Sequence, residues 1–146
     1  MEFVDRQKEQ QRLKELLNRD SPQFIIVRGR RRIGKSALIG RVLDNDDIYY
    51  EADRTAAPNQ MRVFSQVVST QFPGFGDAIY ADWKALLKAI NHRVTGPLTV
   101  CLDEFPYLVE NTPALPSIIQ GLLDDDKEPL RYNLILCGSF STFQIY

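Results

Sequence analysis

Four short apolar runs are spaced along the chain, and each is predicted to be a strand. They span residues 24–27, 48–50, 98–102 and 133–137. Residues 24–27 are rich in β-branched side chains without polar alternation, which is typical of a strand buried on both faces of a parallel sheet. We expect the run at residues 98–102 to be buried in the same way.

Segments with helical spacing of apolar residues lie between these runs. The sequence predicts helices over residues 5–19, 36–43 and 58–72, a helix after an N-cap at Asp82, and a helix opened by Thr112-Pro113. Alternating strands and helices predict an α/β fold in which helices cover both faces of a parallel sheet.

Length and composition narrow the function classes. The 146 residues fit one domain, with an N-terminal helix region at residues 1–20 and a core at residues 21–146. A net charge of −1 argues against a nucleic-acid binder that relies on bulk positive charge. No apolar run approaches the roughly 18 residues of a membrane span, and no signal segment is visible, so we expect a cytoplasmic protein. Cys101 and Cys137 are expected to be buried thiols in a reducing cytosol.

The most specific motif is GRRRIGKS at residues 29–36, which matches the P-loop pattern GxxxxGK[ST]. Its glycines permit a tight turn that brings backbone N–H groups to phosphate oxygens, and the following helix N-terminus favours negative charge. Lys35 can reach the β- and γ-phosphates, and the Ser36 hydroxyl can ligate Mg²⁺. Because a strand precedes the motif and a helix follows it, a nucleotide site explains it better than a glycine turn without a ligand.

The predicted nucleotide contacts extend through the loop into the helix. They are Gly29, Arg30, Arg31, Arg32, Ile33, Gly34, Lys35, Ser36 and Ala37. The loop arginines allow two interpretations. They could clamp phosphate or serve as an arginine finger, or they could point outward into solvent. We favour solvation for at least two of the three.

A second motif is the acidic pair Asp103-Glu104 at the end of the apolar run 98–102. A buried parallel strand would hold Asp103 at the carboxyl edge of the sheet, where the P-loop also lies. Asp103 could then hold Mg²⁺, and Glu104 could orient or deprotonate an attacking water. The alternative is a strand that simply runs out into acidic turn residues, which the P-loop upstream disfavours.

Three further residues receive roles from their positions. Ser139 follows the fourth run, where it could sense the γ-phosphate or the attacking water, or merely form a Gly-Ser turn. His92 lies near a helix end and is expected to be a surface or capping residue. Trp83 is expected to lie in the core by its spacing.

With these motifs in place, the chain resembles the archaeal-type AAA+ ATPase family. The stretches that carry the resemblance are FVDR at residues 3–6, the P-loop through Leu38, DEFPYL at residues 103–108 and LILCGS at residues 134–139. The resemblance covers almost the whole chain. The last two stretches are more specific than the P-loop, which many families share.

The resemblance implies a domain that binds ATP with Mg²⁺ and has strand order 5-1-4-3-2. It implies that Asp103 is the Walker-B acid, Glu104 the catalytic glutamate and Ser139 the sensor. It also implies that Phe3 and Arg6 lie near the adenine. Relatives of this type continue into a fifth strand, a helical lid and a C-terminal region that is often nuclease-like or DNA-associated.

Residues 140–146 depart from the family pattern, and we expect the domain to lack the fifth strand and the lid. ATP binding should then survive better than hydrolysis, because turnover also needs a closed, dry site. Without the fifth strand, residues 24–27 would form an open sheet edge, which predicts self-association into a homo-oligomer.

Three function classes stay open on the sequence. The first is a working ATPase. The second is a catalytically silent nucleotide-binding or interaction module. The third is a small-molecule kinase, which the Asp103-Glu104 pair and the Gly138-Ser139 strand end disfavour. Phosphate release from ATP alone would indicate an ATPase. Tight ATP binding without release would indicate a silent module, and ADP formation only with an added acceptor would indicate a kinase.

Overall fold

The computed structural model describes residues 6–28 and 35–138, apart from the side chains of Arg6, Lys35 and Ser36. In this part of the chain, one parallel sheet is formed by β1 (Phe24–Arg28), β2 (Ile48–Glu51), β3 (Thr99–Asp103) and β4 (Asn133–Gly138). The order across the sheet is β1-β4-β3-β2, as the family resemblance implied for these strands. The α/β prediction is therefore confirmed.

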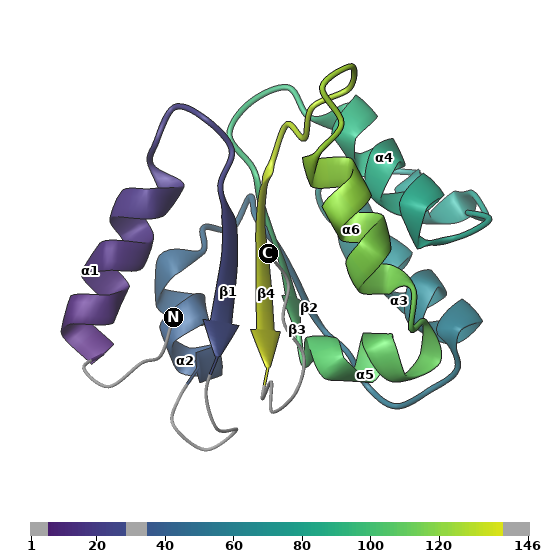
Figure 1. The fold of residues 1–146 in the computed structure, drawn as a ribbon, viewed down its shortest axis with the longest axis horizontal. Helices are drawn as coiled ribbons and strands as arrows, with labels where there is room; N and C mark the ends of the chain where they lie inside the picture. The colour runs from purple at the N-terminus through teal and green to yellow at the C-terminus, as the bar shows by residue number, and fades with distance from the viewer. Residues whose placement is uncertain (1–5, 29–34, 139–146) are drawn as a thin grey trace.

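Helices cover both faces of this sheet (Figure 1). The described helices are α1 (Arg6–Leu17), α2 (Lys35–Val42), α3 (Ala57–Ser69), α4 (Trp83–Arg93), α5 (Phe105–Asn111) and α6 (Leu115–Leu123), with a 3-10 turn η1 (Phe75–Asp77). Helices α1 and α2 lie on one face, and α3, α4 and α6 lie on the other. In residues 6–28 and 35–138, no helix has both the length and the apolar character needed to cross a bilayer.

The sheet separates two apolar clusters because side chains alternate along each strand. The larger cluster contains Val100 and Leu102 of β3 together with the α3, α4 and α6 helices. The smaller cluster contains Cys101 of β3 and Leu38 and Ile39 of α2. Successive residues of β3 thus pack in different clusters. A shift of register by one residue would move each side chain to the opposite face of the sheet.

Burial along the strands follows their positions in the sheet. Every residue of β3 and β4 is buried, as expected for the two inner strands. In β1, by contrast, only Ile25 and Val27 are buried, while Phe24 and Ile26 are half-buried. The prediction that residues 24–27 are buried on both faces was therefore wrong for one face, because β1 has only β4 beside it in the described sheet. Self-association through this strand stays a prediction.

Two helix boundaries differ most from the sequence prediction. Helix α3 ends at Ser69 instead of Phe72, because the chain turns back into η1 and the Gly76 N–H donates to the Ser69 hydroxyl at 2.6 Å. Helix α6 begins at Leu115 instead of at Thr112-Pro113, because Thr112 belongs to the turn after α5 and its N–H donates to the Leu108 carbonyl. The N-cap at Asp82 is confirmed by a 2.8 Å bond from the Ala85 N–H.

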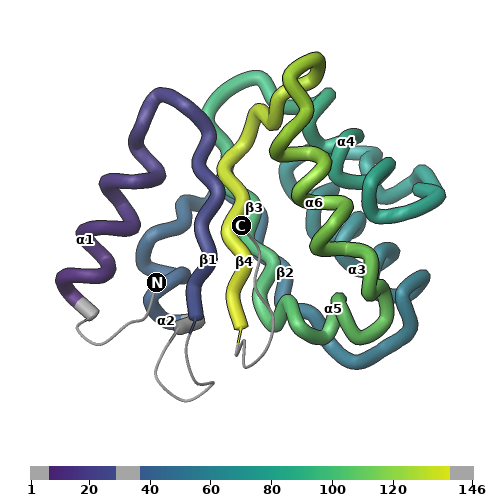
Figure 2. Tube along the Cα trace, viewed as in Figure 1, coloured from purple at the N-terminus to yellow at the C-terminus, as the bar shows by residue number. Residues whose placement is uncertain are grey.

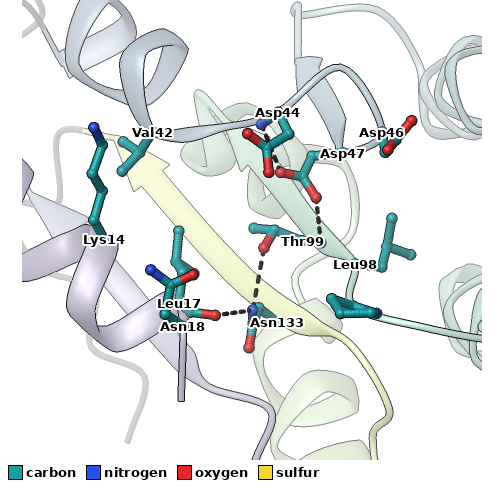
Figure 3. A pocket seen from close by; sticks show the side chains of 11 residues that line it. Lys14, Leu17, Asn18, Val42, Asp44, Asp46, Asp47, Leu98, Thr99 and Asn133 are labelled. Carbon is teal, nitrogen blue, oxygen red and sulfur yellow. Dashed lines mark hydrogen bonds between the residues drawn. The ribbon is translucent and has the colours of Figure 1, made fainter. Parts of the chain in front are cut away.

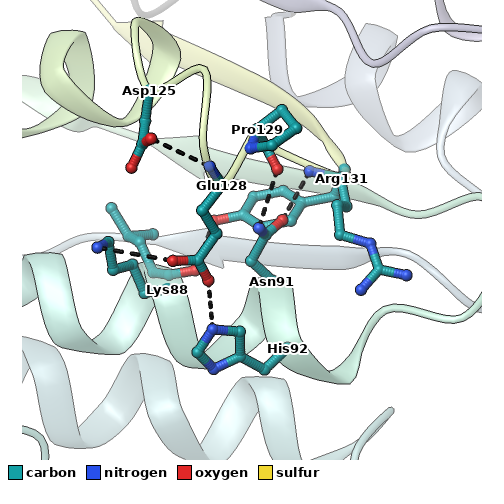
Figure 4. A network of polar contacts seen from close by, with 9 residues as sticks. Lys88, Asn91, His92, Asp125, Glu128, Pro129 and Arg131 are labelled. Atoms are coloured by element: carbon teal, nitrogen blue, oxygen red, sulfur yellow. Dashed lines mark hydrogen bonds and ion pairs between the residues drawn. The ribbon is translucent and has the colours of Figure 1, made fainter.

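A polar network holds the loop that leads into β4 (Figure 4). The Asn91 side chain donates to the Pro129 carbonyl at 3.1 Å and accepts from the Arg131 N–H at 2.6 Å. His92, in the last turn of α4, contacts the Glu128 carboxylate, which also lies 3.7 Å from the Lys88 ammonium. His92 is thus an exposed residue in a structural network, as predicted, and Trp83 is buried in the core.

Helix α5 was not predicted, and it packs closely on the end of β4 (Figure 2). A methyl group built on Gly138 would lie 2.5 Å from Cδ of Pro106. Pro106 sits in the first turn of α5, where its ring cannot swing aside. The first turn of α5 and the end of β4 therefore require a glycine at position 138.

We expect Gly138→Ala to lower the free energy of unfolding by about 1–3 kcal/mol, because the added methyl group overpacks the contact with Pro106. Gly121→Ala in α6 is the matched control. Its methyl group meets open space, so helix propensity should stabilise the protein by about 0.5–1 kcal/mol. Urea denaturation followed by circular dichroism measures both, and equal stability of the two variants would contradict the packing argument.

Candidate functional site

Among the described residues, Asp103, Gly138 and the start of α2 lie at the carboxyl edge of the sheet. Asp103 at the end of β3 is in register with Glu51 at the end of β2, and Gly138 at the end of β4 is in register with Arg28 of β1. Helix α2 begins at Lys35 and follows β1 in the chain, and β1 ends at this same edge (Figure 1). In open α/β sheets this edge is where ligands bind.

The Asp103 carboxylate is buried, with 1% of the residue exposed, and both of its oxygens accept hydrogen bonds. The Tyr49 hydroxyl donates to Oδ2 at 2.5 Å, and the Glu104 N–H donates to Oδ1 at 2.8 Å. A buried carboxylate needs such donors, because an uncompensated polar group in the interior costs several kcal/mol. The two bonds hold the carboxylate in one orientation.

The face on which Asp103 lies follows from the alternation of β3. Cys101, two residues earlier, packs in the smaller cluster against α2. Asp103 therefore points to the α2 side of the sheet, which is the side on which the P-loop sequence enters its helix. The carboxylate and the N-terminus of α2 thus share one face and one edge.

Glu104 is the only non-glycine residue in the described chain with positive φ. Its φ of 54° and ψ of 39° are left-handed, and it is the N-cap of α5. This conformation lets the chain leave the strand and enter a helix within one residue, while the Glu104 carbonyl accepts from the Tyr107 N–H at 2.9 Å. A left-handed glutamate costs about 1–2 kcal/mol, and such strain clusters at functional sites.

Buried thiols lie beneath this edge. The Cys101 and Cys137 sulfurs are 3.6 Å apart, and both residues are fully buried, as the sequence predicted. The hydrogen bond with Cys137, followed by burial, raises the pKa of the Cys101 thiol well above its usual value. The Cys101 thiol is therefore neutral, and it adds no negative charge behind Asp103.

Several predicted contacts lie outside the described residues. These are Phe3, Gly29, Arg30, Arg31, Arg32, Ile33, Gly34 and Ser139. For Arg6, Lys35 and Ser36 the structure describes only the backbone, with Lys35 and Ser36 in the first turn of α2. Ala37 follows them and is exposed. Ala37, Asp103 and Glu104 are thus the predicted site residues whose side chains the structure describes.

Two residues at this edge were missed in the sequence. Tyr49 was only part of a predicted strand, although its offset from Asp103 across a parallel pair could have indicated it once the register was known. Arg54 follows the end of β2, and its guanidinium lies 4.7 Å from the Tyr107 ring centroid and 3.7 Å from the Glu110 carboxylate. Arg54 is largely exposed, so this ion pair adds little stability.

A different cavity, of about 440 Å³, opens at the amino end of the sheet (Figure 3). Thr99 and Asn133, the first residues of β3 and β4, line it. Asp47 also lines it and accepts from the Thr99 N–H at 2.9 Å, while Asp44 and Asp46 add further carboxylates. Burial raises the pKa of Asp47. A wall with three acidic residues repels phosphate, so this cavity is a poor candidate for a nucleotide.

Comparison with known proteins gives one family and one fold. A family model described as an ATPase domain predominantly from Archaea matches residues 3–145. The chain is 31% identical over 138 residues to MJECL04, an uncharacterised protein of Methanocaldococcus jannaschii, and the match covers 94% of this chain and 29% of that protein. The chain therefore spans less than a third of this relative's length.

Among solved structures, the chain is similar to the Aeropyrum pernix ORC1 protein in complex with DNA. The TM-score is 0.66 at 20% identity, over 93% of this chain and 39% of that chain. It is also similar to the Aeropyrum pernix ORC2 protein in its ADPNP-ADP complexes, with a TM-score of 0.53 at 21% identity, over 94% of this chain and 42% of that chain. With identities this low, the likeness bears on the fold alone.

The left-handed backbone at Glu104 predicts different stabilities for two substitutions at this position. Glu104→Gly should be more stable than Glu104→Ala by about 1 kcal/mol, because only glycine adopts positive φ without a steric cost. At Glu15, inside α1, the order should reverse, with alanine more stable than glycine by a similar amount. Chemical denaturation of the four variants measures this, and the same order at both positions would refute the assignment of strain.

Proposed function

The chain belongs to the family of ATPase domains found predominantly in archaea, and from this premise we propose that it binds ATP with Mg²⁺ and hydrolyses it. The expected resemblance to archaeal-type AAA+ ATPases is thereby confirmed. One observation carries the proposal. Asp103 presents a buried carboxylate, held by two hydrogen bonds, on the face and edge where α2 begins.

The donor set suits Mg²⁺. This ion prefers oxygen ligands, keeps several waters, and is usually held by one or two side chains together with substrate phosphates. In the described residues, no group of three His, Cys, Asp or Glu side chains forms a cage that could hold a metal alone. Asp103 and the Ser36 hydroxyl are the residues that would hold the ion. When bound, Mg²⁺ would neutralise charge on the β- and γ-phosphates.

The chain's own residues supply the remaining roles. Backbone N–H groups of residues 29–34 and the N-terminus of α2 would bind phosphate oxygens, and Lys35 would reach the β- and γ-phosphates. Glu104 would orient the attacking water or take its proton, because it lies directly beside the metal-holding Asp103. Ser139 would contact the γ-phosphate from the end of β4.

The left-handed conformation of Glu104 supports a catalytic role for it. A strained backbone persists only where its surroundings hold it, and here the N–H is fixed on Asp103 and the carbonyl on Tyr107. Asp103 and Glu104 are consequently oriented as one unit.

The solved structures with a similar fold support nucleotide binding, but they do not indicate the biological process in which this chain would use ATP. ORC2 of Aeropyrum pernix was solved with ADPNP and ADP, and ORC1 with DNA. This chain spans 39% of the ORC1 chain. We do not extend DNA binding to residues 1–146, because their net charge of −1 provides no bulk attraction for DNA.

Removing the side chain of Lys35 or of Asp103 should reduce or abolish the stabilisation of the folded protein by Mg·ATP. At 100 times its Kd, a ligand raises the free energy of unfolding by about 2.7 kcal/mol. We expect this gain in wild type and in the control Lys84→Ala, whose side chain is exposed on α4. We expect it to be lost in Lys35→Ala and strongly reduced in Asp103→Ala. Thermal unfolding with and without Mg·ATP measures the gain, and an unchanged gain in Lys35→Ala would exclude the P-loop site.

Turnover should depend on the second carboxylate while binding does not. Glu104→Gln is expected to bind Mg·ATP as wild type does and to lower phosphate release from ATP by about 100-fold or more, the usual effect of losing a general base. Glu110→Gln, on the same helix, should release phosphate at the wild-type rate. Persisting release in Glu104→Gln would place the base elsewhere. Tight binding without release in wild type would identify a silent module.

A further inference from the structure

Tyr49 joins the edge strand β2 to the Asp103 carboxylate. Its hydroxyl donates to Oδ2 of Asp103 at 2.5 Å. Tyr49 is paired in register with Cys101, and its ring packs in the smaller cluster on the α2 side of the sheet. The hydroxyl therefore reaches Asp103 diagonally across the β2–β3 pair, on the same face.

The two donors on Asp103 act on different oxygens. The Glu104 N–H binds Oδ1, and the Tyr49 hydroxyl binds Oδ2. A carboxylate with only one donor can still rotate about its Cβ–Cγ bond, whereas donors on both oxygens fix its plane. Each carboxylate oxygen has two lone pairs, so a hydrogen bond to an oxygen does not by itself prevent that oxygen from binding a metal or a metal-bound water.

We propose that Tyr49 is a positioning residue that orients Asp103 toward the metal of the nucleotide site, so that its loss weakens Mg²⁺ binding specifically. The inference rests on the proposed function, because it needs a metal at Asp103. Groups that act through a metal ligand commonly change metal affinity or activity by about 10–100-fold when they are removed. Tyr49 would not touch the nucleotide or the reacting atoms.

The chain contains a matched control at the next position. Tyr50 points to the opposite face of β2, where it is buried and its ring lies 5.3 Å from the Phe64 ring. Tyr50→Phe removes the same hydroxyl from the same strand and leaves both donors on Asp103 in place. The two phenylalanine variants therefore separate the contact with Asp103 from the general effect of deleting a tyrosine hydroxyl.

The test uses the full chain as wild type, Tyr49→Phe, Tyr50→Phe, Asp103→Ala and the double variant Tyr49→Phe/Asp103→Ala. Calorimetry with ATP in EDTA measures nucleotide affinity without metal. A Mg²⁺ titration at saturating ATP, followed by thermal unfolding, then measures the metal concentration for half-maximal stabilisation.

Tyr49→Phe should bind ATP in EDTA as wild type does but need about 10-fold or more Mg²⁺ for half-maximal stabilisation. Tyr50→Phe should match wild type in both measurements. In the Asp103→Ala background, Tyr49→Phe should have no further effect on the metal dependence, because the group it orients is gone.

Two results would overturn the inference. One is a wild-type Mg²⁺ dependence in Tyr49→Phe, and the other is an equal loss of ATP affinity with and without metal, which would indicate a merely structural role. Failure of the proposed function has a different signature, in which wild type and Asp103→Ala show the same Mg²⁺ dependence. If Asp103→Ala differs from wild type and Tyr49→Phe does not, only the role of Tyr49 is refuted.

Discussion

The alternation of side chains along the fully buried strand β3 is the constraint on which the rest of the structure depends. Val100 and Leu102 enter the larger core, while Cys101 and Asp103 face α2. An acid at the end of this pattern is necessarily placed on the α2 side. Because β2 and β4 pair with β3 in parallel, their carboxyl ends lie at the same edge. Core packing and site placement therefore follow from one register.

Burying Asp103 is unfavourable by itself, and two of the described residues offset this cost by donating hydrogen bonds to it. One is local, the N–H of the next residue, and the other comes from Tyr49 on a neighbouring strand. The local donor depends on the left-handed turn at Glu104, which also begins α5. The first turn of α5 then packs on Gly138 and so borders the point where β4 ends. The acidic pair, the first turn of α5 and the end of β4 are thus connected by direct contacts.

Much of this arrangement could be predicted from the sequence. The strands were visible as apolar runs, and the acidic pair stood out because it follows one of them directly. The P-loop was visible as a local pattern with the expected flanking elements. Helix α5 was missed because it begins with a left-handed glutamate and a proline, without a long apolar stripe. The C-terminal end of α3 and the start of α6 were misplaced, because hydrogen-bonded turns determine where these helices end and begin.

By itself, the sequence determined the local features, namely the alternation of strands and helices, the P-loop motif and the identity of the acidic pair. These depend on residues that are close together along the chain. Only the tertiary structure decided which face of the sheet Asp103 occupies and that Tyr49, separated from it by more than a helix, donates to it. It also decided that β1 is half-buried on one face. Such features depend on register and on pairing between distant strands, which the order of residues along one strand does not specify.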